Sequence, residues 1–202
     1  MAATVANVLY LHGLNSAPQS VKASLLGAAI DALPVEMRPH FTVPALDHRP
    51  AKAMRDVCAW IDAHRSGELT LVGSSLGGFY ATCLAERYAA RAVLINPSVR
   101  PFDDLERYLG TQRNPYSGAT WELTRAHFAE LRAFAVDAIT RPERYWLMVQ
   151  SGDEVLDWRV AVAYYAGAWQ LVQGGGDHSF QQFAAQIPPL LRFAGVDGVL
   201  AS

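Results

Sequence analysis

Short apolar runs recur along the chain, and longer segments of mixed polarity separate them. Each run is five to seven residues long and rich in Val, Leu, Ile or aromatic side chains, which is typical of a buried strand. Six runs predict strands at Val5–Leu11, Phe41–Leu46, Leu69–Gly73, Ala92–Asn96, Tyr145–Gln150 and Trp169–Gln173.

In the segments between these runs, apolar residues return at helical spacing. The predicted helices are Gln19–Leu33, Ala51–His64, a helix after the Gly73–Gly78 turn that ends near Tyr88, Trp158–Ala166, and a C-terminal helix from Ser179 with a break at Pro188-Pro189. Because buried strands that alternate with helices form a parallel sheet covered on both faces, we expect an α/β fold in three layers with about six parallel strands.

The alternation of strand and helix stops between Pro97 and Pro142, over a stretch far longer than an ordinary connection. Two parts of this stretch, Phe102–Leu109 and Trp121–Phe134, have helical spacing. We therefore expect residues 1–202 to form one domain, with residues 97–142 inserted in it as a helical cap.

Composition and charge exclude several classes of protein. The chain has 202 residues, of which 51% are hydrophobic and 18% charged, so intrinsic disorder is excluded. The formal net charge of −2 provides no basic surface for nucleic acid. The two cysteines, Cys58 and Cys83, lie in apolar helical segments and are expected to be buried, reduced thiols.

No segment has the features of a membrane span or a secretory signal. The longest uncharged stretches, Leu69–Ala85 and Val160–Gly176, contain glycines and polar residues and fall short of the roughly 20 apolar residues that a spanning helix needs. The first residues, MAATVANVLYLHG, carry no basic residue before their apolar run. A soluble, cytoplasmic protein is the expectation.

A Gly-x-Ser-x-Gly motif, Gly73-Ser74-Ser75-Leu76-Gly77, lies directly after a predicted strand and before a predicted helix. A nucleophilic serine needs such a tight turn, in which Gly73 and Gly77 remove side chains that would collide with neighbouring elements. The N-terminus of the following helix favours the negative charge that develops during acyl transfer. Ser75 is thus a candidate nucleophile. A simple tight turn or a phosphate cradle are the alternatives.

Candidates for the acid and the base follow in the order Ser, Asp, His. Asp153 follows the strand at 145–150 in a glycine turn, and His178 follows the strand at 169–173 on a glycine-rich loop. The carboxyl ends of parallel strands meet at one edge of the sheet, so these residues are expected to converge with Ser75. Asp157 is the rival acid, although its place before Trp158 favours a helix N-cap. Asp177 is expected to be structural.

Two backbone N–H groups would complete such a site as an oxyanion hole. One belongs to Leu76, directly after the candidate nucleophile, and the other to Leu14, in the loop after the first strand. Gly13 permits close approach there. His12 is expected to fix this loop by hydrogen bonds and not to act as a second base.

Metal and cofactor motifs are missing from the sequence. It contains no His-Glu-x-x-His, no cysteine pair at zinc spacing and no phosphate-binding loop, so we expect no metal and no cofactor. His127 is a weak candidate for lining the cleft. Four aromatic residues of the insertion either line an acyl pocket or, more commonly, pack a helix pair; they are Tyr108, Tyr116, Trp121 and Phe128.

Several long segments together resemble one known family, the YqiA-type esterases, which are small bacterial α/β-hydrolases. The segments are HGLNSAPQSVKA, GSSLGGFYAT, NPSVRPFDDLERYLG, NPYSG, SGDEVLDWRVAV and GGGDHSFQQF. The resemblance runs from Leu9 to about Phe193 and implies an α/β-hydrolase fold with esterase or thioesterase activity. It also implies that Ser75, Asp153 and His178 are nucleophile, acid and base. Leu14 stands where the family pattern suggests Phe, and the tail after Phe193 matches nothing.

These observations predict a serine hydrolase that cleaves carboxylic esters or thioesters of acyl substrates through an acyl-enzyme, with a small-molecule ester or acyl thioester as its partner. Two alternatives remain open. The same triad serves an acyl-CoA thioesterase or a small acyltransferase, and a hydrolase scaffold can serve as a binding protein without catalysis. The sequence does not determine the oligomeric state.

Overall fold

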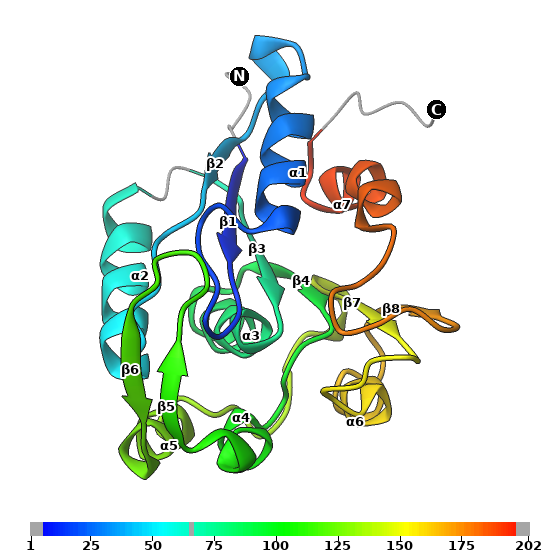
Figure 1. Ribbon diagram of the computed structural model, residues 1–202. Coiled ribbons are helices and arrows are strands. Elements are labelled where there is room, and N and C mark those ends of the chain that lie inside the picture. The colour runs from blue at the N-terminus through cyan, green and yellow to red at the C-terminus, as the bar shows by residue number, and fades with distance from the viewer. Residues whose placement is uncertain (1–5, 65–66, 197–202) are drawn as a thin grey trace.

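The computed structural model describes residues 6–64 and 67–196, and its centre is a six-stranded parallel sheet (Figure 1). The strand order is β2-β1-β3-β4-β7-β8, with every neighbouring pair parallel. The strands are β1 (Asn7–Leu11), β2 (His40–Thr42), β3 (Leu69–Ser74), β4 (Arg91–Ile95), β7 (Tyr145–Gln150) and β8 (Trp169–Gln173). All six predicted strands are confirmed; Val5, at the start of the first prediction, lies outside the described residues.

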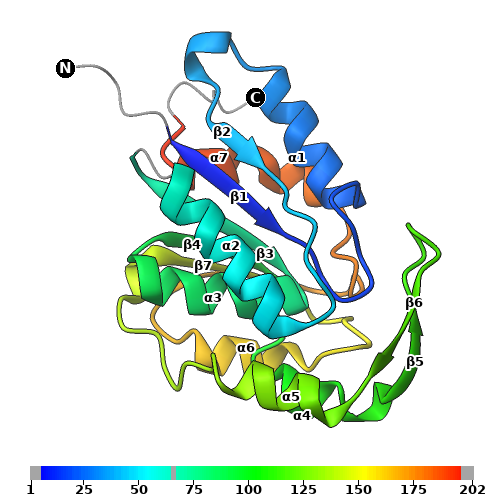
Figure 2. The same cartoon turned by 90° about the vertical axis from the view of Figure 1, so that its left-hand side faces the viewer.

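Helices cover both faces of the sheet, so the three-layer α/β prediction is confirmed. One face carries α1 (Val21–Asp31) and α7 (Ile187–Phe193), and the other carries α2 (Pro50–His64), α3 (Leu76–Tyr88) and α6 (Trp158–Tyr164) (Figure 2). In β1, Val8 and Tyr10 pack beneath α1, whereas Leu9 and Leu11 face the α2 and α3 layer. This alternation with a period of two places two separate cores around one sheet.

Strand β2 is shorter than its apolar run, which extends to Leu46. Pro44 interrupts that run, and proline has no N–H to give to a sheet ladder. The chain beyond Thr42 is therefore free to lie beside the loop that follows β1.

The segment between Pro97 and Pro142 differs from the helical cap that its spacing predicts. It contains α4 (Pro101–Asp104), a short 3₁₀ turn at Glu106–Tyr108, an antiparallel hairpin of β5 (Gly110–Arg113) and β6 (Thr120–Leu123), and α5 (Arg125–Arg132). The expected helix over 121–134 thus begins only at Arg125. The hairpin has its own local cause, because the Asn114 side chain accepts hydrogen bonds from the Tyr116 and Ser117 N–H groups and so closes the turn.

The C-terminal helix also departs from its prediction. Pro188 and Pro189 do not break a helix; they lie in the first turn of α7. A proline there loses no hydrogen bond, because the first N–H groups of a helix have no partner within it.

Cys58 and Cys83 are buried and unpaired, as predicted. Within residues 6–64 and 67–196, no helix is long and apolar enough to cross a membrane. Residues 197–202, at the end of the unmatched tail, are outside the described part.

Candidate active site

Ser75 forms the sharp turn between β3 and α3, and its backbone is strained there, with φ 55° and ψ −123°. A non-glycine residue at such a φ costs about 1–3 kcal/mol, which the surrounding packing must supply. A Cβ at Gly73 would overlap the backbone of Gly77, and a Cβ at Gly77 would overlap the carbonyl of Leu11. Both glycines are therefore required by close backbone contacts, as the motif predicts.

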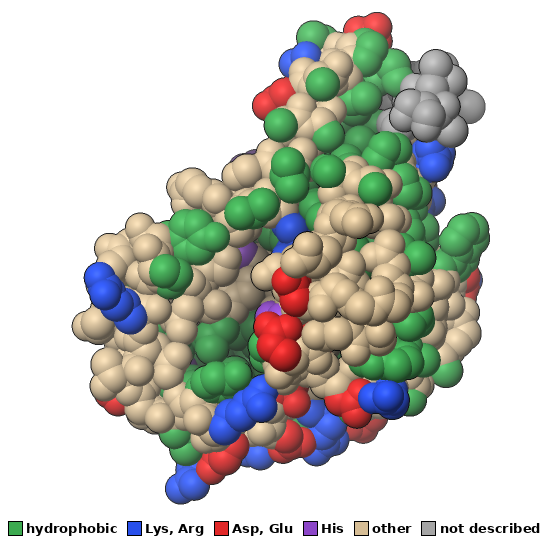
Figure 3. Space-filling view, turned by 45° about the vertical axis from the view of Figure 1, so that its right-hand side comes forward, with side chains coloured by type: hydrophobic (Ala, Val, Ile, Leu, Met, Phe, Trp, Pro, Cys, Tyr) green, Lys and Arg blue, Asp and Glu red, His purple; other side chains and the backbone are tan. Residues whose placement is uncertain are grey.

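The structure brings the three predicted side chains into one chain of hydrogen bonds. Nε2 of His178 lies 3.0 Å from the Ser75 hydroxyl, and Nδ1 lies 2.9 and 3.0 Å from the two carboxylate oxygens of Asp153. The Asp153 side chain is 2% exposed and that of His178 is 22% exposed. Figure 3 shows a hollow on one face of the molecule, with purple histidine atoms inside it and red carboxylate groups at its edge.

Asp153 is held as a carboxylate by the loop that follows β7. Its Oδ1 atom also accepts hydrogen bonds from the N–H groups of Val155 and Leu156, both at 2.9 Å. Burial raises the pKa of Asp153, but the hydrogen bonds from His178 and from the two N–H groups outweigh burial and leave the pKa below its ordinary value. Asp157 instead caps α6 and accepts from the Arg159 N–H at 3.0 Å.

Two buried amide side chains, which the sequence analysis did not select, fix the loop that carries His178. Nδ2 of Asn96 donates to the carbonyls of Asp177 and His178 at 2.9 and 3.1 Å, and its Oδ1 accepts from the Gln150 N–H. Oε1 of Gln150 accepts from the N–H groups of Asp177 and Gln181, and Nε2 donates to the Gln181 carbonyl. Their only signal is position, since each lies at or just after the carboxyl end of a central strand.

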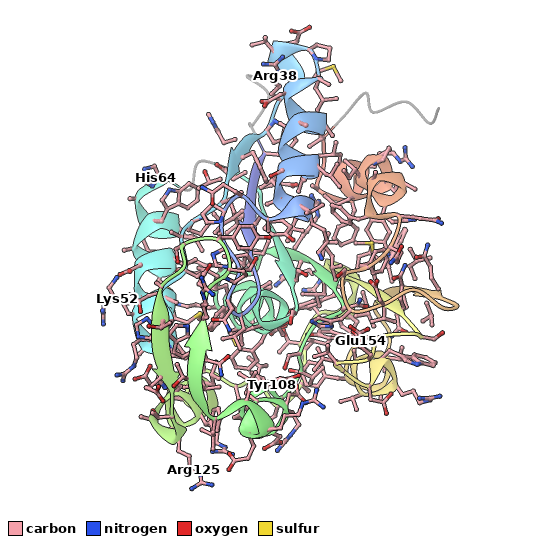
Figure 4. The ribbon with its side chains drawn as sticks, viewed as in Figure 1. Arg38, Lys52, His64, Tyr108, Arg125 and Glu154 are labelled. Carbon is pink, nitrogen blue, oxygen red and sulfur yellow. The ribbon has the colours of Figure 1, made fainter. Side chains whose placement is uncertain are left out.

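Direct contacts also join the acid loop to the base loop. The Gly152 N–H donates to the Gly175 carbonyl at 2.8 Å, and a Cβ at Gly152 would overlap the Gly176 carbonyl. The carboxylate of Glu154, labelled beside α6 in Figure 4, accepts from the His178 N–H at 3.0 Å. The short distances around His178 therefore rest on two loops that pack as one unit.

The predicted oxyanion residues lie beside Ser75. Leu14, Ser75 and Leu76 together line a small cavity of about 30 Å³, and a Cβ at Gly13 would come within 3.2 Å of the Ser75 Cβ. His12 fixes the base of this loop, because its Nε2 accepts from the Leu46 N–H at 3.3 Å while Nδ1 lies 3.0 Å from the Gly13 carbonyl. Burial lowers the pKa of His12, and the two contacts of its ring place it as a residue that fixes the loop by hydrogen bonds, as expected.

The far wall of the small cavity comes from the insertion. The Ser98 hydroxyl donates to the Asp104 carboxylate at 2.5 Å, and burial raises the pKa of Asp104. Arg107 donates to the Val155 carbonyl at 2.6 Å and so ties the insertion to the acid loop. Tyr108, labelled near α4 in Figure 4, completes this wall.

The other candidates divide between cavity walls and core. Trp121 lines a second cavity, of about 220 Å³, and Tyr116 a third, of about 480 Å³, whereas Phe128 is buried in the core. His127 is buried and lines none of these three cavities; its Nδ1 accepts from the Thr124 N–H at the start of α5. Among the described residues, no group of three or more His, Cys, Asp or Glu side chains is arranged to hold a metal ion.

Comparison with known sequences places this site in a family. Residues 7–195 match the uncharacterised protein family UPF0227. The chain belongs to this family. The match confirms the resemblance to the YqiA-type group that the sequence motifs carry. The UPF0227 segment begins with β1 and ends just after α7, so it contains the whole sheet and all three residues of the hydrogen-bonded chain.

Solved structures similar to this UPF0227 protein have α/β-hydrolase folds. The crystal structure of a protein from Agrobacterium vitis S4, named as a hydrolase, is 20% identical in sequence to this chain, with a TM-score of 0.72 over 93% of this chain and 87% of its own. Mouse alpha/beta hydrolase domain-containing protein 10 is 17% identical, with a TM-score of 0.70 over 92% and 89%. The esterase domain of a Rhodothermus marinus protein is 18% identical, with a TM-score of 0.66 over 95% and 87%. At these identities the likeness establishes the fold.

Proposed function

We propose that this UPF0227 protein is a serine esterase that hydrolyses carboxylic esters or thioesters of acyl substrates. The observation that carries the proposal is the continuous chain of hydrogen bonds from Ser75 through His178 to Asp153. A serine hydroxyl becomes a nucleophile when a base accepts its proton and an acid orients that base. The esterase among the similar folds is consistent with this chemistry.

In the proposed reaction, Nε2 of His178 accepts the Ser75 proton while the hydroxyl oxygen attacks the carbonyl carbon. The N–H groups of Leu14 and Leu76 stabilise the oxyanion of the tetrahedral intermediate. His178 then gives the proton to the leaving alcohol or thiol, and the acyl group remains on Ser75. Water attacks the acyl-enzyme in the same way, releases the carboxylic acid and regenerates the serine.

The test is hydrolysis of p-nitrophenyl butyrate by the wild-type protein and by Ser75→Ala and His178→Ala. We expect both variants to be folded, with activity reduced by at least about 10³-fold. Ser24→Ala, which changes an exposed serine on α1, is the control and retains wild-type turnover. Undiminished turnover in Ser75→Ala would overturn the proposal.

Ester and thioester substrates are distinguished by a parallel assay. Release of CoA from palmitoyl-CoA, measured beside hydrolysis of p-nitrophenyl butyrate, compares the two leaving groups on one triad. Higher kcat/KM on the thioester would identify a thioesterase, and transfer of the acyl group to an added alcohol would identify an acyltransferase. A folded wild-type protein inactive in all three assays would favour a binding protein on a hydrolase scaffold.

A further inference from the structure

The β5–β6 hairpin is bound to the loop that follows β1, although about a hundred residues separate them. In Figures 1 and 2 the hairpin stands away from the sheet, with its tip near this loop. The Trp121 indole N–H donates to Oδ1 of Asn15 at 2.9 Å, and Nδ2 of Asn15 donates to Oε1 of Gln112 at 3.0 Å. A third bond runs from Nδ2 of Asn114 to the Ser16 carbonyl at 3.0 Å.

These bonds reach the residue next to the proposed oxyanion donor. Asn15 directly follows Leu14 and has a left-handed backbone, with φ 52°. Asparagine tolerates this conformation better than most residues, but the conformation is still less favourable than an extended one. The direction of the Leu14 N–H depends on the orientation of the neighbouring peptide planes. The hydrogen bonds that hold Asn15 therefore also help to orient the Leu14 N–H.

The loop is thus fixed at both ends by different parts of the chain. His12 holds its beginning through the Leu46 N–H and the Gly13 carbonyl. The hairpin supplies the side-chain hydrogen bonds to Asn15 and Ser16 among the described residues. The contacts of His12 lie next to the core of the sheet. The contacts of Asn15 and Ser16 instead depend on the β5–β6 hairpin, which is half-exposed along most of its length.

We propose that Asn15 is a positioning residue, through which the Trp121 indole and the hairpin hold the Leu14 N–H in place for the oxyanion. The inference rests on the proposed esterase function and deepens it. The cavity of about 220 Å³ lies between the hairpin and the oxyanion loop. Leu14 and Leu76 line it from the side of the proposed oxyanion hole, and Trp121 and Asn114 line it from the hairpin. A substrate group in this cavity contacts the hairpin and the oxyanion loop together, so substrate recognition and oxyanion stabilisation share one set of contacts.

The test compares two substitutions that remove these bonds with little change in packing. Asn15→Gly removes the amide and keeps access to the left-handed backbone, and Trp121→Phe removes the indole N–H and keeps an aromatic ring. Both are measured for kcat and KM on p-nitrophenyl butyrate and for inhibition by a trifluoromethyl ketone, whose adduct with the serine carries an oxyanion. Glu122→Gln, on β6 but bonded to Thr111 of the hairpin itself, is the control.

For Asn15→Gly we expect kcat to fall by about 10- to 100-fold, less than the loss of a whole oxyanion donor. KM stays within about twofold, and the inhibition constant of the ketone rises by the same factor as kcat/KM falls. In Trp121→Phe we expect kcat to fall by about 3- to 10-fold. Asn15→Asp keeps the acceptor for the indole N–H and should recover part of the kcat that Asn15→Gly loses. Glu122→Gln should have the wild-type kcat.

Two results would overturn the inference and leave the proposed function intact. One is wild-type kcat in Asn15→Gly; the other is an increase in KM alone, with no change in inhibition by the ketone, which would make the hairpin a ground-state binding surface. A wild-type protein that neither hydrolyses the ester nor binds the ketone would instead contradict the proposed function itself.

Discussion

The turn that carries Ser75 and the loop that carries His178 are held in place by different kinds of contact. At the Ser75 turn, backbone packs directly on backbone, and Gly73 and Gly77 leave no room for a side chain. At the His178 loop, only Gly152 among the described glycines makes such a close backbone contact, and buried amides supply most of the support, with Asn96 and Gln150 bonded to the loop backbone.

This difference predicts how each region responds to change. A steric contact between backbones has no intermediate state, so an added methyl group either displaces a strand or prevents folding. A hydrogen-bonded support loses its bonds one by one, each worth about 1–3 kcal/mol when the partner is left buried and unsatisfied. A side chain added at Gly73 or Gly77 should therefore destroy the Ser75 turn, whereas removal of the amides should weaken the His178 loop in steps.

The largest expected effect is that of Gly77→Ala. The new Cβ would overlap the Leu11 carbonyl in the neighbouring strand, so we expect no folded, soluble protein. Gly174→Ala, at the beginning of the His178 loop, is the control, because no atom lies within 4 Å of a Cβ there. The yield of soluble protein and the thermal midpoint test the pair, and a Gly77→Ala variant with the wild-type midpoint would disprove the steric account.

The next largest effect separates the two candidate acids. Asp153→Asn removes the carboxylate that orients His178, and we expect kcat to fall by about 10³- to 10⁴-fold in a folded protein. Asp157→Asn leaves the hydrogen bonds between Ser75, His178 and Asp153 intact. It should change kcat less than twofold, since Asn is also a good N-cap for α6. Steady-state kinetics on p-nitrophenyl butyrate decide between them, and loss of activity only in Asp157→Asn would reverse the assignment.

A smaller, graded loss is expected at Gln150. Gln150→Leu leaves the N–H groups of Asp177 and Gln181 without their acceptor, and should lower the free energy of unfolding by about 1–3 kcal/mol. We expect kcat to fall by about tenfold as the His178 loop shifts. Gln150→Glu keeps an acceptor oxygen for these two N–H groups and should recover part of both losses. Denaturant unfolding measures the free energy of unfolding, and steady-state kinetics measure kcat. If neither changes in Gln150→Leu, the Gln150 amide does not support the His178 loop.

The smallest effect is a pH dependence of stability from Asp153. Because its folded pKa lies below the ordinary value of 3.8, the carboxylate stabilises the fold fully above that value and loses this contribution as pH falls through the folded pKa. Free energies of unfolding between pH 2 and 6 should fall more steeply in the wild-type protein than in Asp153→Asn. Parallel curves would mean that the acid has the same pKa folded and unfolded.

How much of this could be predicted depends on the range of each interaction. The six strands follow from local apolar runs, and Ser75, Asp153 and His178 follow from their places at strand ends and the order of the residues. Asn96 could not be selected, because its bonds reach residues 81 and 82 positions away. The hairpin was missed for another reason: Trp121 and the residues around it fit helical spacing, although the 114–118 segment carries a turn signal.

Activation of Ser75 is tested most directly by the intact mass of the protein after incubation with a fluorophosphonate, followed by peptide mapping of the adduct. If His178 activates Ser75, the wild-type protein takes up one adduct per chain, on Ser75, and His178→Ala takes up none on the same timescale. A folded wild-type protein that takes up no label, or a label on another serine, would contradict the assignment of Ser75 as an activated nucleophile.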